Sequence, residues 1–354
     1  MTIRGPIGII ACSSGKPFAT KVAEELAKLR KESQLKLIIP TKESHFANTE
    51  IKTELLSKVR GTDVYIIQDV ENGVIPTNEN GVQVRKEPYS VDENLRALKT
   101  ALYAAKICGA GHITAVLPIF PYSRQDKQQA REAITAALVA EEIEHAGADS
   151  VITMDIHNLA IAGFFKKAVF INLFGSRNLI PYIKENINLN NLVVVAPDEG
   201  SVKRASFFAR ELQTKLAIMH KERDYSKINE VVNIKLLGDV NNKDVLLVDD
   251  MIDTAGTLAK AARTLKLEHG AKNIYFVTSL SCLNNPAFEL LKRLYDEGIL
   301  TQLITTDAVY HGEDLEKRYP WYKEVSVAEY VARVINTTNT GESVSSLLKR
   351  VVIN

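Results

Sequence analysis

The stretch Val245-Leu246-Leu247-Val248-Asp249-Asp250-Met251-Ile252-Asp253-Thr254-Ala255-Gly256-Thr257 decides the fold. Its four leading apolar residues predict a strand buried on both faces, as in a parallel sheet. Two carboxylates, Asp249 and Asp250, end the predicted strand, and apolar residues at helical spacing from Leu258 to His269 predict a helix after a short turn. A strand, a turn of small residues and a helix together direct free backbone N–H groups and a positive helix end at one point, which suits a phosphate.

Side chains around this turn predict what else the ligand carries. The hydroxyls of Thr254 and Thr257 can donate to the same phosphate. Asp249 and Asp250 cannot bind phosphate, but they can accept hydrogen bonds from sugar hydroxyls or hold a hard cation. A phosphorylated ribose would use both groups. The alternative is an ordinary turn whose acidic residues simply favour a helix N-terminus.

Composition limits the class of protein. The chain has 354 residues, enough for two domains, with 45% hydrophobic residues, 25% charged residues and a net charge of +1. This balance predicts neither nucleic acid nor a membrane surface as a partner, and no apolar run approaches the roughly 18 residues of a spanning helix. The first residues lack a signal-peptide pattern. Three scattered cysteines, Cys12, Cys108 and Cys282, are expected to be buried free thiols in a reducing, cytoplasmic compartment.

The rest of the chain alternates strand and helix patterns, which predicts an α/β fold with mainly parallel sheets flanked by helices. In the first half, strands are expected at residues 7–11, 35–39, 64–68, 113–120 and 151–155, and helices at 18–29, 92–108 and 134–145. In the second half, strands are expected at 192–196, 215–219, 245–248, 274–278 and 303–306, and helices at 202–212, 258–269 and from about 288. An edge strand or hairpin is expected at 231–237, terminal helices at 327–335 and 344–350, and a long loop at 69–90.

Four further polar groups follow predicted strands, at the sheet edge where α/β proteins bind ligands. They are Arg124-Gln125-Asp126-Lys127, Asp155-Ile156-His157, Asp198-Glu199-Gly200-Ser201 and Lys221-Glu222-Arg223. Cations at such an edge can bind phosphate oxygens. Taken alone, the charged groups would be interpreted as solvated surface charge and His157 as a structural histidine.

The order of these groups resembles the ribose-phosphate diphosphokinase (PRPP synthetase) family, and the opening stretch resembles the PRPP signature of type I phosphoribosyltransferases. The resemblance runs from about Gly8 to Lys349. It implies two phosphoribosyltransferase-like, Rossmann-like domains. Residues 1–170 would form the ATP side and residues 171–339 the ribose 5-phosphate side, with a C-terminal helix at 340–354 packing back on the first domain.

The resemblance also implies transfer of diphosphate from ATP to the 1-hydroxyl of ribose 5-phosphate, giving PRPP and AMP, with Mg²⁺. ATP would be bound by Phe46, Asn48, Glu50, Arg124, Gln125 and Lys127, and the metal by His157 and Asp198. Lys221 and Arg223 would be catalytic, in a mobile loop that closes on the transferred group. Ribose 5-phosphate would be held by Asp249, Asp250, Asp253, Thr254, Ala255, Gly256 and Thr257. The family implies a dimer-based homo-oligomer such as a hexamer.

Some residues depart from the family pattern. Asn48 replaces a carboxylate, and Ala255 replaces a frequent glycine. Two other functions stay open. A phosphoribosyltransferase that consumes PRPP would need only one α/β domain. A non-catalytic regulatory subunit would be expected to lose the cations Lys221 and Arg223, which are present here.

Overall fold

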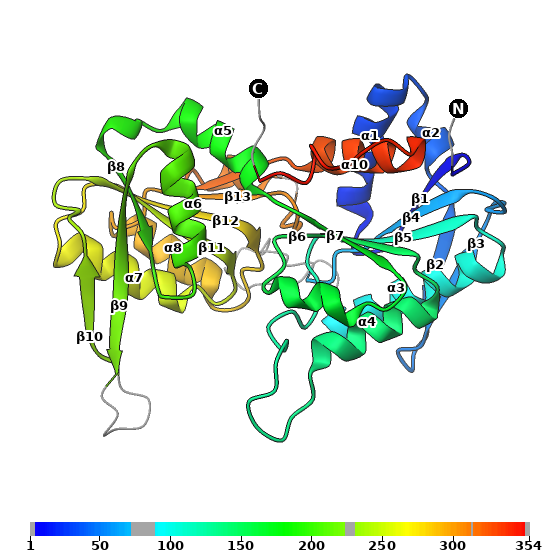
Figure 1. The fold of residues 1–354 in the computed structure, drawn as a ribbon, viewed down its shortest axis with the longest axis horizontal. Coiled ribbons are helices and arrows are strands. Elements are labelled where there is room, and N and C mark those ends of the chain that lie inside the picture. The colour runs from blue at the N-terminus through cyan, green and yellow to red at the C-terminus, as the bar shows by residue number, and fades with distance from the viewer. Residues whose placement is uncertain (1–3, 72–88, 224–230, 313, 351–354) are drawn as a thin grey trace.

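The computed structural model describes residues 4–71, 89–223, 231–312 and 314–350. It has two α/β halves that lie side by side (Figure 1). The elements of the first half are β1 (Ile7–Ala11), α1 (Lys16–Arg30), α2 (Gln34–Leu37), β2 (Thr41–His45), β3 (Ile51–Leu55), β4 (Asp63–Ile67), α3 (Val91–Ile107), β5 (His112–Leu117), α4 (Thr135–Ala146), β6 (Ser150–Met154), the 3-10 helix η1 (Leu159–Phe164) and β7 (Val169–Leu173).

The sheet of the first half has the order β1-β4-β5-β6-β7, and every neighbouring pair is parallel. Strands β4 and β6 are buried along their whole length, as their apolar sequences predict. Helix α1 lies above the sheet in Figure 1, and helices α3 and α4 lie below it. Strands β2 and β3 form a separate antiparallel hairpin.

The second half is built around a larger sheet. Its elements are α5 (Ser176–Asn186), the 3-10 helix η2 (Leu189–Asn191), β8 (Leu192–Ala196), α6 (Val202–Leu212), β9 (Lys215–Arg223), β10 (Val231–Leu237), β11 (Asp244–Ile252), α7 (Gly256–Leu267), β12 (Ile274–Ser281), α8 (Ala287–Asp296), β13 (Gln302–Thr306), α9 (Leu315–Arg318), β14 (Tyr322–Val325) and α10 (Ala328–Thr340). The strand order is β10-β9-β8-β11-β12-β13-β14, and only the edge strand β10 is antiparallel to its neighbour. Helices α5 and α6 contribute to one apolar core of this sheet, and α7 and α8 to another.

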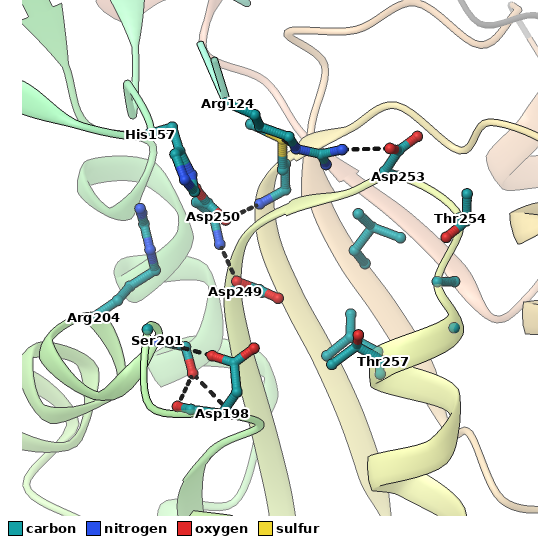
Figure 2. A pocket seen from close by; sticks show the side chains of 16 residues that line it. Arg124, His157, Asp198, Ser201, Arg204, Asp249, Asp250, Asp253, Thr254 and Thr257 are labelled. Carbon is teal, nitrogen blue, oxygen red and sulfur yellow. Dashed lines mark hydrogen bonds and ion pairs between the residues drawn. The ribbon is translucent and has the colours of Figure 1, made fainter. Parts of the chain in front are cut away.

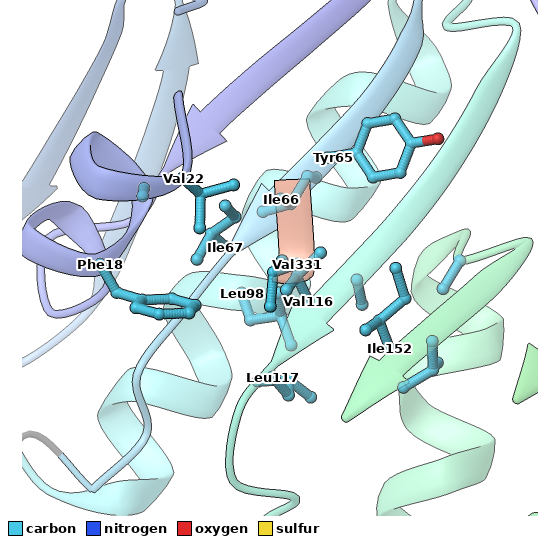
Figure 3. Close-up of a cluster of buried hydrophobic side chains, with 14 of the residues drawn as sticks. Phe18, Val22, Tyr65, Ile66, Ile67, Leu98, Val116, Leu117, Ile152 and Val331 are labelled. Atoms are coloured by element: carbon cyan, nitrogen blue, oxygen red, sulfur yellow. The ribbon is translucent and has the colours of Figure 1, made fainter. Parts of the chain in front are cut away.

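The last helix, α10, completes the core of the first half. Val331, Val334 and Ile335 are buried in the same cluster as Phe18 and Val22 of α1. Figure 3 shows Val331 beside side chains of β4 and β5. Polar contacts fix the same packing, since the Asn339 amide donates to the buried Asp63 carboxylate at 2.9 Å. The chain therefore returns to its first half after the second sheet is complete.

Most predicted elements are present, and two predicted elements are wrong. Residues 35–39 form no strand; they belong to α2 and to a single bridge between Ile38 and Ile9, because a short apolar run fits either structure. Residues 344–350 form turns, so the helix that packs on the first half is α10. The edge strand of the first sheet, β7, spans the predicted division between the two halves at residue 170.

The predicted loop at 69–90 falls mostly outside the described residues, which resume at Tyr89. Cys12 and Cys282 are buried free thiols, whereas Cys108 is exposed, which corrects the prediction of three buried thiols. In the described parts of the chain, no helix is long and apolar enough to cross a membrane.

Candidate active site

A cavity of about 410 Å³ lies where the two halves meet (Figure 2). The first half contributes Arg124 and His157 to its wall. The second half contributes Asp198, Gly200, Ser201, Arg204 and the continuous run from Asp249 to Leu258. Most of the strand-end groups selected from the sequence therefore meet in one place.

The cavity opens where β11 extends beyond the end of its neighbour β8. Pairing between these strands ends at Leu247, and farther along β11 pairs only with β12. Helices α6 and α7 follow β8 and β11 and pack into different cores of the sheet, which leaves a crevice between them. Asp249 and Asp250 lie inside β11, not after its end as predicted, and they border this crevice.

The two adjacent carboxylates differ in charge state. Burial, together with the neighbouring Asp250 carboxylate, raises the pKa of Asp249 to about 7. Burial acts in the same direction on Asp250, but a hydrogen bond from His157 and the charge of Arg204 overcome it and lower the pKa of Asp250. The His157 Nδ1 atom lies 2.8 Å from Asp250 Oδ2, and this contact raises the pKa of His157. At neutral pH the pair thus combines one firm anion with one carboxyl group close to its titration point.

The turn from Asp253 to Thr257 begins helix α7 and lines the cavity. Ala255 adopts a left-handed conformation with φ of 61°, and no side chain caps the helix. The first N–H groups of an α-helix have no partner within the helix, so those of α7 are open to a ligand. This arrangement has the form that the sequence predicted for a phosphate turn.

Arg124 bridges the two halves at the cavity rim. Its guanidinium forms an ion pair with Asp253 and also contacts the Met251 sulfur at 3.0 Å. The other carboxylate oxygen of Asp253 accepts from Asn284 at 2.9 Å. Arg124 also lines a second cavity of about 290 Å³, together with Tyr122, Gln125, Asn284 and other residues.

The neighbouring predicted residues are less involved. The Gln125 side-chain oxygen accepts a hydrogen bond from Thr135 at 2.6 Å, although Gln125 still lines the second cavity. Lys127 is exposed and is not among the residues that line either cavity.

The turn after β8 forms another wall. Asp198 Oδ1 accepts from the Ser201 backbone N–H at 3.1 Å, so this carboxylate holds the turn that leads into α6. One helical turn farther, Arg204 also faces the cavity. Arg204 was not selected from the sequence, although its position three residues after Ser201, on the same side of α6, was a signal for it.

Two groups of predicted residues lie elsewhere. Phe46, Asn48 and Glu50 lie at the tip of the β2–β3 hairpin, where Phe46 is exposed and Asn48 accepts from the Glu50 backbone. None of these three lines the cavities that contain Arg124. Lys221 and Arg223 lie in β9, opposite Ile234 and Val231 of β10, which corrects the prediction that they belong to a loop. The loop that follows, residues 224–230, is outside the described residues.

Comparison with known proteins accounts for both halves. Residues 7–147 match the family model for the N-terminal domain of ribose phosphate pyrophosphokinase, and residues 172–313 match the phosphoribosyl transferase domain. The chain belongs to the ribose-phosphate pyrophosphokinase family. The ribose-phosphate pyrophosphokinase of Porphyromonas gingivalis is 36% identical to this chain, over 86% of this chain and 88% of its own length. Ribose-phosphate pyrophosphokinase A of Dictyostelium discoideum is 39% identical, over 85% of this chain and 87% of its own length.

The fold agrees with this family. A crystal structure of phosphoribosylpyrophosphate synthetase from Mycobacterium smegmatis matches with a TM-score of 0.78 and 31% identity, covering 94% of this chain and 98% of that one. The prediction of two phosphoribosyltransferase-like α/β domains and the resemblance to the ribose-phosphate pyrophosphokinase family are therefore confirmed.

Proposed function

We propose that this chain transfers diphosphate from ATP to the 1-hydroxyl of ribose 5-phosphate, producing PRPP and AMP. The observation that carries the proposal is that the turn from Asp253 to Thr257 of the second half lines the same cavity as Arg124 and His157 of the first half. Curated relatives named ribose-phosphate pyrophosphokinase support the same reaction. The N-terminal domain match weighs against a phosphoribosyltransferase that consumes PRPP.

The residues of the second half would hold the sugar phosphate. The N–H groups at the start of α7 and the hydroxyls of Thr254 and Thr257 would bind the 5-phosphate. Asp249 and Asp250 would accept hydrogen bonds from ribose hydroxyls, and Asp253, Ala255 and Gly256 would complete the turn. This arrangement would leave the 1-hydroxyl pointing toward the first half.

The residues of the first half would hold the nucleotide, with Arg124 on its phosphates and Gln125 and Lys127 nearby. The 1-hydroxyl oxygen would attack the β-phosphorus while the bond from that phosphorus to the α,β-bridging oxygen breaks, and AMP would leave. Catalysis of such a step depends on alignment of the reactants and on neutralisation of charge. We assign the neutralising role to Lys221 and Arg223, whose backbone lies in β9 beyond its last pairing with β8.

The donor atoms of the cavity fit Mg²⁺ that arrives with the nucleotide. Mg²⁺ prefers oxygen ligands, usually one or two carboxylates plus phosphates and water. Asp198 supplies such an oxygen, and His157 is held by Asp250 at the same wall. No group of three metal-ligating side chains is assembled within the described residues, which agrees with a metal carried by the substrate rather than by a protein cage. When bound, the metal would neutralise phosphate charge.

The hairpin residues Phe46, Asn48 and Glu50 would reach ATP from a second copy of the chain. Their tip is exposed and lies outside the wall of either cavity that contains Arg124. A dimer-based homo-oligomer, with a hexamer as its family form, is therefore part of the proposal. We also propose the division into an ATP side (1–170) and a ribose 5-phosphate side (171–339), a cytoplasmic location, and no nucleic acid or membrane as partner.

The experiment that tests the function is an assay for AMP formation from ATP in the presence and absence of ribose 5-phosphate. The expected result is AMP that appears only with the sugar, together with equal amounts of PRPP. PRPP consumption in the presence of a free base would identify a phosphoribosyltransferase instead. No turnover in a folded chain that binds both substrates would identify a regulatory subunit.

A further inference from the structure

We propose that Arg204 is a further binding cation for the diphosphate group, and that Asp155 positions it from the other half of the molecule. This inference deepens the proposed function, because it assigns residues to the transferred group. Arg204 lies in α6 and faces the cavity. Asp155 follows β6 and is buried, with 5% of its side chain exposed.

The first observation is where the Arg204 charge is balanced. Among the described residues that line the cavity, Arg124 is paired with Asp253 and His157 with Asp250. The Arg204 partner is Asp155, which does not line the cavity. A phosphate can therefore approach Arg204 without displacing a carboxylate from the cavity wall.

The second observation is how firmly Asp155 is held. Its Oδ1 atom accepts from Arg204 Nη1 at 3.1 Å. Its Oδ2 atom accepts from the Gly175 backbone N–H at 2.8 Å and from the Ser279 hydroxyl. One carboxylate of the first half thus contacts α6, β12 and the residue before α5 in the second half. A carboxylate that accepts from this many donors is held in one orientation and fixes the cation that it binds.

Glycine at position 175 is part of this geometry. A Cβ atom there would lie 2.5 Å from Ser279 Oγ and 3.3 Å from Asp155 Oδ2. The close approach of the backbone therefore requires glycine. Asp155 itself has φ of 41°, and His157, two residues later, lines the cavity.

The third observation is the direction in which Arg204 points. In Figure 2 its guanidinium lies near His157, on the opposite side of the cavity from Thr254 and Thr257. The turn at Thr254 and Thr257 is the proposed site of the sugar 5-phosphate. Arg204 is consequently placed for the other phosphate ligand, the diphosphate group. A guanidinium offers paired N–H donors that suit phosphate oxygens, and one donor of Arg204 is already used by Asp155.

The test is calorimetric binding of inorganic diphosphate to the full chain at constant magnesium. Arg204→Ala should raise the Kd for diphosphate about 10- to 100-fold, the usual effect of losing a charge-assisted contact. Ribose 5-phosphate affinity should change less than about threefold. Arg210→Ala is the matched control, because Arg210 lies on the same helix with 70% of its side chain exposed. Equal diphosphate affinity in Arg204→Ala and the wild type would overturn the assignment.

Asp155→Asn tests the positioning role. An amide cannot accept at both ends, so either Arg204 or Gly175 loses its acceptor. The Kd for diphosphate should rise about tenfold, and the double variant with Arg204→Ala should bind no worse than Arg204→Ala alone. Ser279→Ala removes another Asp155 contact and should lower thermal stability while leaving diphosphate affinity within about twofold of the wild type.

Asp155→Glu replaces Asp155→Asn if the latter does not fold, because it keeps the charge and moves the carboxylate. Unchanged diphosphate affinity in the folded Asp155 variant, or additive losses in the double variant, would reject the positioning role. These measurements need no turnover. A chain that makes no AMP but binds diphosphate through Arg204 would retain this inference and lose the proposed reaction, whereas an active chain that is indifferent to Arg204→Ala would do the reverse.

Discussion

The backbone of Ala255 has a conformation that residues other than glycine rarely adopt. Its φ of 61° lies in the left-handed region, at the residue before α7. The resemblance to the family marked this position, where glycine is frequent. The strain falls in the turn proposed for the sugar phosphate, and a strained turn persists only where its surroundings hold it.

Replacing Ala255 with glycine should raise the free energy of unfolding by about 1 kcal/mol, because the left-handed conformation then has no steric cost. Urea unfolding measures this change. Ala259→Gly, four residues later inside α7, should lower the free energy of unfolding by at least about 1 kcal/mol. A loss of stability in Ala255→Gly would contradict the left-handed conformation.

Lys221 is expected to act mainly in the transition state. Lys221→Ala should lower kcat by about 10²- to 10³-fold with little change in KM, the usual loss for one charge-stabilising donor. Arg223→Ala should behave alike, and the double variant should lose less than the product of the two. Lys215→Ala, an exposed position at the start of the same strand, is the control. Near-normal kcat with a strongly raised KM would make Lys221 a ground-state binder.

At the scale of elements, the end of α4 holds the chain that leads into β7. One oxygen of Glu144 accepts from the backbone N–H groups of Lys166, Lys167 and Ala168 at 2.8, 2.6 and 2.7 Å. Burial opposes ionisation of this group, but the three donors outweigh it and lower the pKa of Glu144. A lowered pKa stabilises the folded state above the unfolded-state pKa, and this stabilisation disappears as the pH falls through the folded-state pKa.

Glu144→Gln should therefore lower the free energy of unfolding by about 1 kcal/mol at pH 7, as for the loss of charge-assisted hydrogen bonds. The difference from the wild type should shrink as the pH falls below about 4, where the carboxylate becomes protonated. Urea unfolding across this pH range measures it. Glu141→Gln, at an exposed position of the same helix, should have little effect at any pH. A constant difference at all pH values would show that charge is not responsible.

At the scale of the whole molecule, contacts across the two halves make the cavity a shared feature. Lys21 of α1 donates to Asp307 at 2.9 Å, and Asp155 accepts hydrogen bonds from three residues of the second half. The β2–β3 hairpin is the exception, because its tip residues belong to neither cavity that contains Arg124. If this tip serves a neighbouring copy, one chain alone has no complete ATP site.

Mixing two inactive variants tests that arrangement. Phe46→Ala and Arg124→Ala chains, unfolded together and reassembled in equal amounts, should recover up to about a quarter of the wild-type activity, because random assembly joins an intact tip to an intact cavity in that fraction of sites. Arg124→Ala mixed with Lys221→Ala should recover nothing, since the proposed function places both residues at the active site of one chain. Full activity of a monomeric chain would contradict the shared site.

The sequence predicted those features that depend on neighbouring residues. The stretch from Val245 to Thr257 contains its own strand, turn and helix start, so its place at the cavity followed from local pattern. Helical spacing from Ser201 was a signal for Arg204, but local pattern could not predict its contact with Asp155, which lies 49 residues away in the chain and in the other half. The β2–β3 hairpin was missed because Thr41–His45 has no fully buried position and therefore no apolar alternation.

The return of α10 to the first half determines when that half can be finished during translation. Val331, Val334 and Ile335 belong to the core that also contains Phe18 and Val22, so a segment made near the end completes a core begun near the start. Domains generally fold in the order of their synthesis, but here the first must wait on the ribosome until nearly all of the second has emerged. Until then, the surface of α1 that α10 covers is open to chaperones. A premature stop codon before Ala328 would therefore damage the half of the molecule that was translated first.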